Sequence, residues 1–335
     1  TLLHVMKDGF ISPDAFLTYL LTALIILQIW SYTTLFVNRH GQNDRYMHVA
    51  IFINMYLLYF MARGIRADWQ EEYYVFNGAW ILIILNITLQ YFRQLKNTNP
   101  AKPWEEVRIK MNIFILLIQC AIILVSFPVY YLTGFPLSPI AVFWGIAGDV
   151  VGSRVNRFVQ VDFGHLTERV MLYVVFTFGE MIIGITDYFE DGINMLYYSI
   201  CAFLIVAGLF SSYGILYDRM IDRKNGSNGI GYLMLHLFLL LSLNNITAAL
   251  EFMREPQVSE LPKNIFLAAS FAMYYIMCFL IMGYNKAEYI PAPKEWLRFS
   301  ISQAVFITAT LLVYKNPAVG IAIAVIYIWT TLGIL

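Results

Sequence analysis

Charged residues are scarce in this chain of 335 residues. Only 13% of them are Asp, Glu, Lys or Arg, whereas about 25% is usual for a soluble domain. The 22 basic residues are balanced by 22 acidic ones, so no strong positive field is present to attract nucleic acid. We therefore expect neither a soluble protein nor a nucleic-acid partner.

Cysteine is also rare, and the signatures of nucleotide and metal chemistry are missing from the sequence. The three cysteines, Cys120, Cys201 and Cys278, show no Cys-x-x-Cys or Cys/His spacing, so zinc and haem have no ligand set. No Walker A motif, dinucleotide-binding glycine fingerprint or Gly-x-Ser-x-Gly elbow occurs. We expect no metal, no cofactor and no catalytic residue, and an enzyme is the less favoured interpretation.

Hydrophobic residues make up 59% of the chain, and the mean hydropathy is +0.64. A helix needs about 20 apolar residues to cross a bilayer core. Eleven segments approach this length, although 139–151 and 301–313 need residues from their flanks. The segments are 16–37, 46–62, 73–91, 111–131, 139–151, 170–186, 195–217, 230–250, 265–284, 301–313 and 317–335. We predict an all-α integral membrane protein with about eleven transmembrane helices, in which residues 1–6 are the tail of a truncated first helix.

Lysine and arginine in the connections between these segments indicate the orientation. Sixteen of them follow the first, third, fifth, seventh and ninth segments, and six lie on the other side. An excess of Lys and Arg marks the cytoplasmic side of a membrane protein. We therefore predict a multi-pass protein of the cytoplasmic membrane, with its carboxyl terminus in the cytoplasm.

Short sequence matches recur along the chain at nearly constant offsets. SYTTLFVNR (31–39) matches SSYGILYDR (211–219), and PWEEVR (103–108) matches PKEWLR (293–298). Each offset crosses six predicted spans, an even number, so the two copies would have the same orientation in the membrane. The pattern predicts two parallel six-helix repeats, residues 1–152 and 153–335, the first of which lacks most of its amino-terminal helix.

The segment GHLTERVMLYVVFTFGEMIIGI (164–185) places a carboxylate inside an apolar helix. Glu180 lies ten residues beyond Val170, which is about 15 Å along a helix and close to the middle of the bilayer. A polar stripe runs along the side of the helix that carries Glu180. Arg169, Tyr173, Glu180 and Asp187 lie on this stripe, and His165 and Thr177 flank it on either side.

A charge at the bilayer centre costs about 2.5–3.5 kcal/mol on insertion scales, so this stripe is expected to face protein or water. Glu180 is then an ion or proton site in a permeation path, a hydrogen-bonded carboxyl that holds helices together, or a catalytic group. Gly179 and Gly184 beside it allow close helix approach or local unwinding. A second carboxylate, Asp149, lies near a cytoplasmic end and could pair with Arg154.

His165, Glu168 and Arg169 share one helix face at the predicted cytoplasmic entrance of this segment. One interpretation is local ion pairing. The other is recognition of an anionic headgroup or substrate by Arg169 together with Arg154 and Arg157. A metal site is not expected, since the His-x-x-Glu unit has no second copy to complete a ligand set.

The repeated motifs supply further polar candidates. Arg39 and Arg219, the latter beside Asp218, end their predicted helices at the cytoplasmic face, where a cation suits the carboxyl end of a helix. His236 and Asn245 lie inside an apolar segment. They are either hydrogen-bonding groups between helices or part of a pore or substrate lining.

The chain resembles the bacterial low temperature requirement A family in three segments, HLTERVMLYVVFTFGEMIIGI, WSYTTLFVNRHGQNDRYMHV and YLMLHLFLLLSLNNITAAL. The most specific element is His-x-x-Glu-Arg followed by Gly-Glu at helical distance. Members of the family usually begin with an acidic, aromatic helix of the type Glu-Leu-Phe-Phe-Asp-Leu-Val. This sequence lacks that helix, so any site that uses its carboxylates is incomplete here. The resemblance implies a polytopic protein of the bacterial inner membrane, tied by name to growth in the cold.

Together these features predict a secondary transporter or channel-like protein that uses a mid-membrane carboxylate for coupling to protons or a small cation. Membrane lipids are the expected partners, while the substrate, a small molecule or a lipid, and the oligomeric state stay open. The alternatives are a membrane-embedded lipid-modifying enzyme and a structural or sensory membrane protein needed for growth in the cold. The expected substrate- or ion-binding residues are Arg39, His165, Glu168, Arg169, Thr177, Glu180, Asp218, Arg219, His236 and Asn245.

Overall fold

The computed structural model describes residues 6–7, 10–63, 69–97, 103–155, 161–186, 188 and 195–333. Helices dominate these residues, and a short antiparallel hairpin of β1 (Met6–Lys7) and β2 (Phe10–Ile11) precedes them. Met6, predicted as the end of a truncated helix, is in a strand instead, because its backbone pairs with Ile11. The rest of that predicted tail, residues 1–5, lies outside the described residues.

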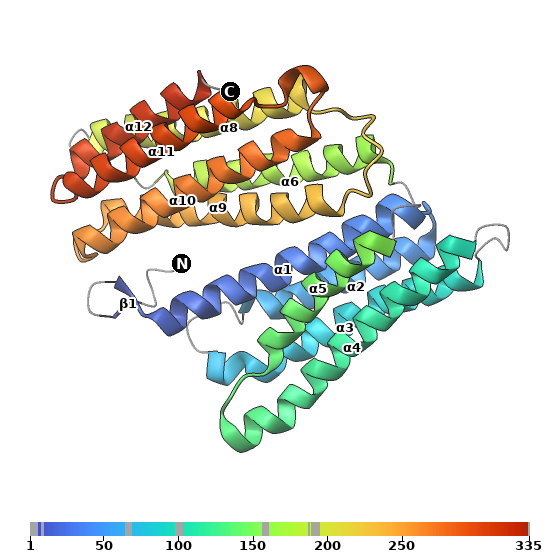
Figure 1. Cartoon of the computed structure of the whole chain (residues 1–335). Helices are drawn as coiled ribbons and strands as arrows, with labels where there is room; N and C mark the ends of the chain where they lie inside the picture. The colour runs from blue at the N-terminus through green and yellow to red at the C-terminus, as the bar shows by residue number, and fades with distance from the viewer. Residues whose placement is uncertain are drawn as a thin grey trace. The chain divides into compact units, whose positions relative to one another are not determined.

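Eleven α-helices are found in the described part of the chain, one for each predicted apolar segment (Figure 1). They are α1 (Pro13–His40), α2 (Arg45–Arg63), α3 (Trp69–Lys96), α4 (Pro103–Thr133), α5 (Ser138–Val155), α6 (Phe163–Gly184), α8 (Leu196–Ile215), α9 (Ile230–Arg254), α10 (Glu260–Ile281), α11 (Pro293–Leu312) and α12 (Pro317–Leu332). A π-helical turn, η4 (Leu216–Met220), continues α8, and two 3-10 turns, η5 (Met282–Tyr284) and η6 (Ala287–Tyr289), follow α10. The all-helical prediction is therefore confirmed.

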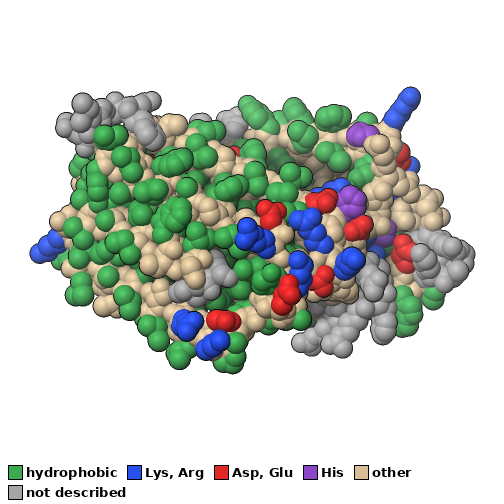
Figure 2. Space-filling model, turned by 90° about the horizontal axis from the view of Figure 1, so that it is seen from above, with side chains coloured by type: hydrophobic (Ala, Val, Ile, Leu, Met, Phe, Trp, Pro, Cys, Tyr) green, Lys and Arg blue, Asp and Glu red, His purple; other side chains and the backbone are tan. Residues whose placement is uncertain are grey.

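Six of the described helical segments are long and apolar enough to cross a membrane: Pro13–His40, Glu72–Lys96, Pro103–Thr133, Leu196–Met220, Ile230–Arg254 and Glu260–Tyr284. Two shorter helices, Ser138–Gly152 and Pro317–Leu332, are also apolar. The predicted number of eleven spans is not confirmed by this measure. Figure 2 shows hydrophobic side chains over much of the visible surface, among fewer charged ones. Such an extensive apolar surface is unusual for a soluble monomer and suits contact with lipid.

Proline and glycine explain several helix boundaries. Pro103, Pro293 and Pro317 each occupy the first residue of a helix, where the missing N–H removes no helical hydrogen bond. After the end of α4, Gly134 has a φ of 71° and donates its N–H to the carbonyl oxygen of Tyr130 (2.8 Å). This left-handed conformation closes the last turn and favours glycine.

The chain forms two compact units. The α1–α5 unit comprises Pro13–Leu166 with Gly226–Leu233, and the α6–α12 unit comprises Thr1–Ser12, Thr167–Asn225 and Met234–Leu335. In the α1–α5 unit, α3 packs against α1, α2 and α4, and α5 packs against α1 and α4. In the α6–α12 unit, α12 packs against α8 and α11, and α11 also packs against α10. Two parallel repeats, divided between residues 152 and 153, stay a prediction.

Candidate functional site

A network of buried side chains joins α1, α4 and α5. Gln119 Nε2 donates to Gln28 Oε1 (2.8 Å), and the Tyr32 hydroxyl donates to Gln119 Oε1 (3.1 Å). Gln28 Nε2 in turn donates to the carbonyl oxygen of Val142 (3.1 Å). Hydrogen bonds of this kind hold membrane helices together, so the position of Tyr32 is well defined.

Gly145 on α5 leaves the space that this network fills. A Cβ atom at this position would lie 2.2 Å from the Tyr32 hydroxyl and 2.4 Å from Gln28 Nε2. We expect Gly145→Ala to lower the free energy of unfolding by about 1–3 kcal/mol, the usual cost of overpacking, measured by thermal denaturation. Gly78→Ala on α3 is the matched control, because a Cβ there meets nothing within 4 Å. Equal stability of the two variants would contradict this account of Gly145.

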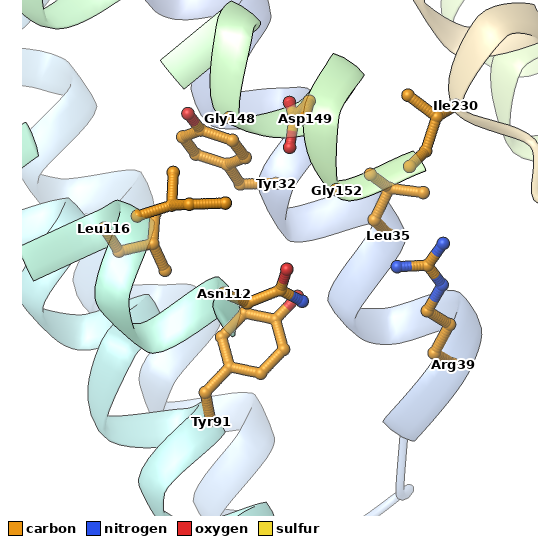
Figure 3. A pocket seen from close by; sticks show the side chains of 11 residues that line it. Tyr32, Leu35, Arg39, Tyr91, Asn112, Leu116, Gly148, Asp149, Gly152 and Ile230 are labelled. Carbon is orange, nitrogen blue, oxygen red and sulfur yellow. The ribbon is translucent and has the colours of Figure 1, made fainter. Parts of the chain in front are cut away.

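Beside this network lies a pocket lined by residues of α1, α3, α4 and α5 and the start of α9 (Figure 3). Its cavity volume is about 20 Å³, which is enough for about one water molecule or a small ion. Its polar lining consists of Tyr32, Arg39, Tyr91, Asn112 and Asp149. The Arg39 guanidinium, the Asn112 amide and the Asp149 carboxylate point into the same space from three different helices.

Asp149 and Arg39 leave polar atoms unsatisfied in this pocket. Asp149 Oδ2 is buried and accepts no hydrogen bond within the described part of the chain. Arg39 Nη2 donates to the carbonyl oxygen of Asn228 (3.3 Å), but Arg39 Nε is buried without a partner among the described residues. The two side chains interact electrostatically. An unsatisfied acceptor and donor beside an internal space suit a bound water molecule or a small ion.

The remaining wall of the pocket brings polar groups and glycine together. Tyr91 and Asn112 lie close together in this wall, and the Tyr91 ring makes an edge contact with Phe36 (4.8 Å between centroids). Next to Asp149, a Cβ at Gly148 would lie 2.7 Å from Ile115 Cγ2. Glycine therefore lets α5 approach α4 closely at the point where α5 carries the carboxylate.

A second pocket lies at the α1–α2 connection, and its charges are paired. Asp44 accepts hydrogen bonds from the Met47 N–H (2.8 Å) and from Arg93 Nη2 (2.6 Å). These two bonds, the first above all, hold the pKa of the Asp44 carboxyl below its ordinary value. Arg93 also lies over the Tyr46 ring, 4.3 Å from its centroid. We assign these contacts to anchoring the connection on α3.

Within the described residues, protein does not enclose most of the site predicted on α6, and Asp187 and Arg157 lie outside the described part of the chain. Four of its residues are exposed: His165, Glu168, Arg169 and Glu180. Thr177 is buried and donates its hydroxyl to the carbonyl oxygen of Tyr173 (3.0 Å), one turn earlier in the same helix. The prediction of close helix approach holds at Gly184, where a Cβ would lie 2.9 Å from Thr247 Cγ2 on α9. It is wrong at Gly179, where a Cβ would meet nothing within 4 Å.

Neither of the two pockets described above contains the other predicted residues of the α6–α12 unit. His236 on α9 is buried, and its Nε2 lies 3.2 Å from the Tyr213 hydroxyl on α8, as expected for hydrogen bonding between helices. Asn245 is also buried, and its Oδ1 has no hydrogen-bond partner within the described residues. Asp218 and Arg219 are exposed in η4.

Sequence patterns missed most of the pocket. Arg39 was predicted from the repeated motif, whereas Tyr91 and Asn112 were not singled out. The sequence allowed a pairing of Asp149 with Arg154, whose side chain lies outside the described residues. The glycines near Asp149, Gly148 and Gly152, could have indicated a close helix contact. Arg108 was counted as a charge of a connection, but α4 begins at Pro103, so Arg108 is helical and only 2% exposed.

Comparison with known proteins supports the resemblance noted in the sequence. The profile of the family described as bacterial low temperature requirement A protein (LtrA) matches residues 2–335, nearly the whole chain. No curated protein and no solved structure shows significant similarity to it. With its apolar helices and this family match, the chain belongs to the LtrA family of bacterial membrane proteins.

Proposed function

We propose that this chain is a secondary transporter or channel-like protein that exchanges protons or small cations at intramembrane carboxylates. The observation that carries the proposal is the unsatisfied oxygen of Asp149 in a pocket that also contains Arg39. Ionisable residues within membrane helices are costly, and they commonly mark ion pathways and proton relays when they face an internal cavity.

In this proposal, Asp149 binds the exchanged proton or cation. The positive charge of Arg39 competes with that proton or cation for the Asp149 carboxylate. The deprotonated carboxylate is stabilised by the nearby guanidinium, with which it interacts electrostatically. A proton or cation bound to Asp149 removes that stabilisation and leaves Arg39 without a counter-charge. The bound and free states therefore differ in their interactions with α1, which is the requirement for a conformational change linked to binding.

Glu180 is the second carboxylate of the proposal. Its side chain is exposed on α6, so it contributes little to packing within the described chain. The free-energy cost of its charge at mid-membrane is then offset by water, by an ion or by a partner chain, and not by buried hydrogen bonds. We propose that it binds the same proton or cation outside the pocket.

The structural or sensory alternative makes a different use of the same pocket. In that case, a fixed water molecule satisfies Asp149, and no ion crosses the membrane. Purified protein in liposomes separates the two possibilities, because only an ion-exchanging protein dissipates an imposed proton or sodium gradient. The lipid-modifying alternative relies on His165, Glu168 and Arg169, and their exposure on α6 gives it no specific support.

The proposed topology places the end of α3 in the cytoplasm and the connection between α9 and α10 outside. Single cysteines at Lys96 and Gln257, both exposed, should therefore react with an impermeant thiol reagent from opposite sides of intact cells. Reaction should be confined to these sites, because Cys120, Cys201 and Cys278 are buried. Labelling of both introduced cysteines from the same side would overturn the proposed orientation.

A further inference from the structure

Arg108 is a buried cation that lacks a paired anion in the described part of the chain. It lies in α4 and is 2% exposed, and its Nε and Nη1 atoms are buried without hydrogen-bond partners. No carboxylate of the described residues lies within 4.0 Å of its guanidinium. Burying a charged group without a partner is strongly unfavourable, so buried charges are normally paired or bound to a ligand.

The carboxylate one turn before Arg108 lies beside a histidine of α1. Glu105 Oε1 lies 3.7 Å from His40 Nδ1 at the end of α1. Glu105 acts on Arg108 electrostatically, but it makes no ion pair with it among the described contacts. It is also partly exposed, with 23% of its side chain open to solvent. Glu105 therefore leaves the buried donors of Arg108 unsatisfied.

A second arginine increases the positive charge at this position. Arg39 acts on Arg108 electrostatically, and the Tyr91 side chain lies close enough to act on both guanidinium groups. Like charges repel more strongly in a low-dielectric interior than in water. Asp149 offsets part of the charge of Arg39, and the partly exposed Glu105 offsets part of the charge of Arg108. The end of α1 and the first turns of α4 thus combine two guanidinium groups, unsatisfied N–H donors and a phenolic hydroxyl.

We propose that Arg108 and Arg39, assisted by the Tyr91 hydroxyl, bind a phosphate group, either as free phosphate or as the headgroup of an anionic phospholipid. Phosphate oxygens match the planar fork of arginine and accept the charge-assisted hydrogen bonds that are missing here. Basic pockets between helices at the cytoplasmic side of a membrane protein are known sites for such headgroups. This binding site does not require ion exchange at Asp149.

The test uses the whole chain in nanodiscs, with Arg108→Gln as the variant and Lys110→Gln as the matched control. Lys110 is on the same helix, but it is exposed and already paired with Glu106 (2.6 Å). Radiolabelled inorganic phosphate is added to protein in phosphatidylcholine, and retained phosphatidylglycerol is counted by native mass spectrometry in a mixed bilayer. We expect binding in one of these two arms to weaken at least about tenfold in Arg108→Gln and to stay unchanged in Lys110→Gln. Binding in the phosphate arm identifies a soluble ligand, and binding only in the phosphatidylglycerol arm identifies a headgroup.

The thermal stability of the wild type and of Arg108→Gln, with and without the anion, provides a second test of the same binding site. In phosphatidylcholine without phosphate, Arg108→Gln should be at least as stable as the wild type, because it removes unsatisfied donors and the repulsion with Arg39. When phosphate or phosphatidylglycerol is present, whichever of them binds, the wild type should be more stable than Arg108→Gln. Arg108→Lys should bind more weakly than the wild type but more tightly than Arg108→Gln, because it keeps the charge and loses the fork. Absence of anion binding by the wild type in both arms, or equal binding by the wild type and Arg108→Gln, would overturn the proposal.

Discussion

Asp149→Asn should reduce the dissipation of an imposed proton or sodium gradient at least about tenfold, because the variant removes the charge and titration that exchange requires. The substitution keeps the size of the side chain. It also breaks no hydrogen bond at Oδ2, which accepts none within the described residues. The measurement is the rate of gradient decay in liposomes that contain equal amounts of folded protein.

Arg39 provides the control for this variant. Removing the carboxylate leaves the Arg39 guanidinium without the charge that it faces, so some stability should be lost. Adding Arg39→Gln to Asp149→Asn should restore thermal stability without restoring flux, as a double-mutant cycle would show. Full flux through a folded Asp149→Asn variant would mean that the pocket takes no part in exchange.

Glu180→Gln should also abolish gradient-coupled flux, while the protein folds and inserts normally. The amide keeps the size and hydrogen-bonding capacity of the carboxyl but cannot titrate. Because Glu180 is exposed, both Glu180→Gln and Glu180→Leu should change the free energy of unfolding by no more than about 0.5 kcal/mol, as is usual for surface positions. Flux and thermal denaturation are measured on the same preparations.

The two outcomes for Glu180 separate transport from packing. A stably folded Glu180→Gln variant with wild-type flux removes Glu180 from the exchange mechanism. A large loss of stability in Glu180→Leu would show instead that its carboxyl makes hydrogen bonds that hold the helices or a partner chain in place.

The helices were predictable because apolar length is a strong local pattern. Each of the eleven apolar segments corresponds to one helix, and the main errors are at the ends. The predicted segment 111–131 begins eight residues after the start of α4 at Pro103, since Glu105, Glu106 and Arg108 resemble a connection when only hydropathy is considered. The structure extends the helix through these charges and buries Arg108.

The inward faces of the helices were not predictable in the same way. Lipid is as apolar as the interior of a helical bundle, so the polar stripe of α6 did not reveal whether Glu180 points to protein. It is exposed, whereas Asp149, near the end of its apolar segment, lines a pocket. The pocket residues Tyr91 and Asn112 come from α3 and α4, and only the packing of these helices against α1 and α5 brings them to Asp149 and Arg39.

The most direct test of ion exchange in this pocket is the infrared spectrum of its carboxyl group in lipid. Difference spectra of the wild type are recorded between acidic and alkaline buffers, and between buffers with and without sodium. The proposal predicts a carboxyl band in at least one of these spectra that is absent from Asp149→Asn and retained in the stability control Gly78→Ala. Spectra of the wild type and Asp149→Asn that are identical under both changes would contradict exchange at Asp149.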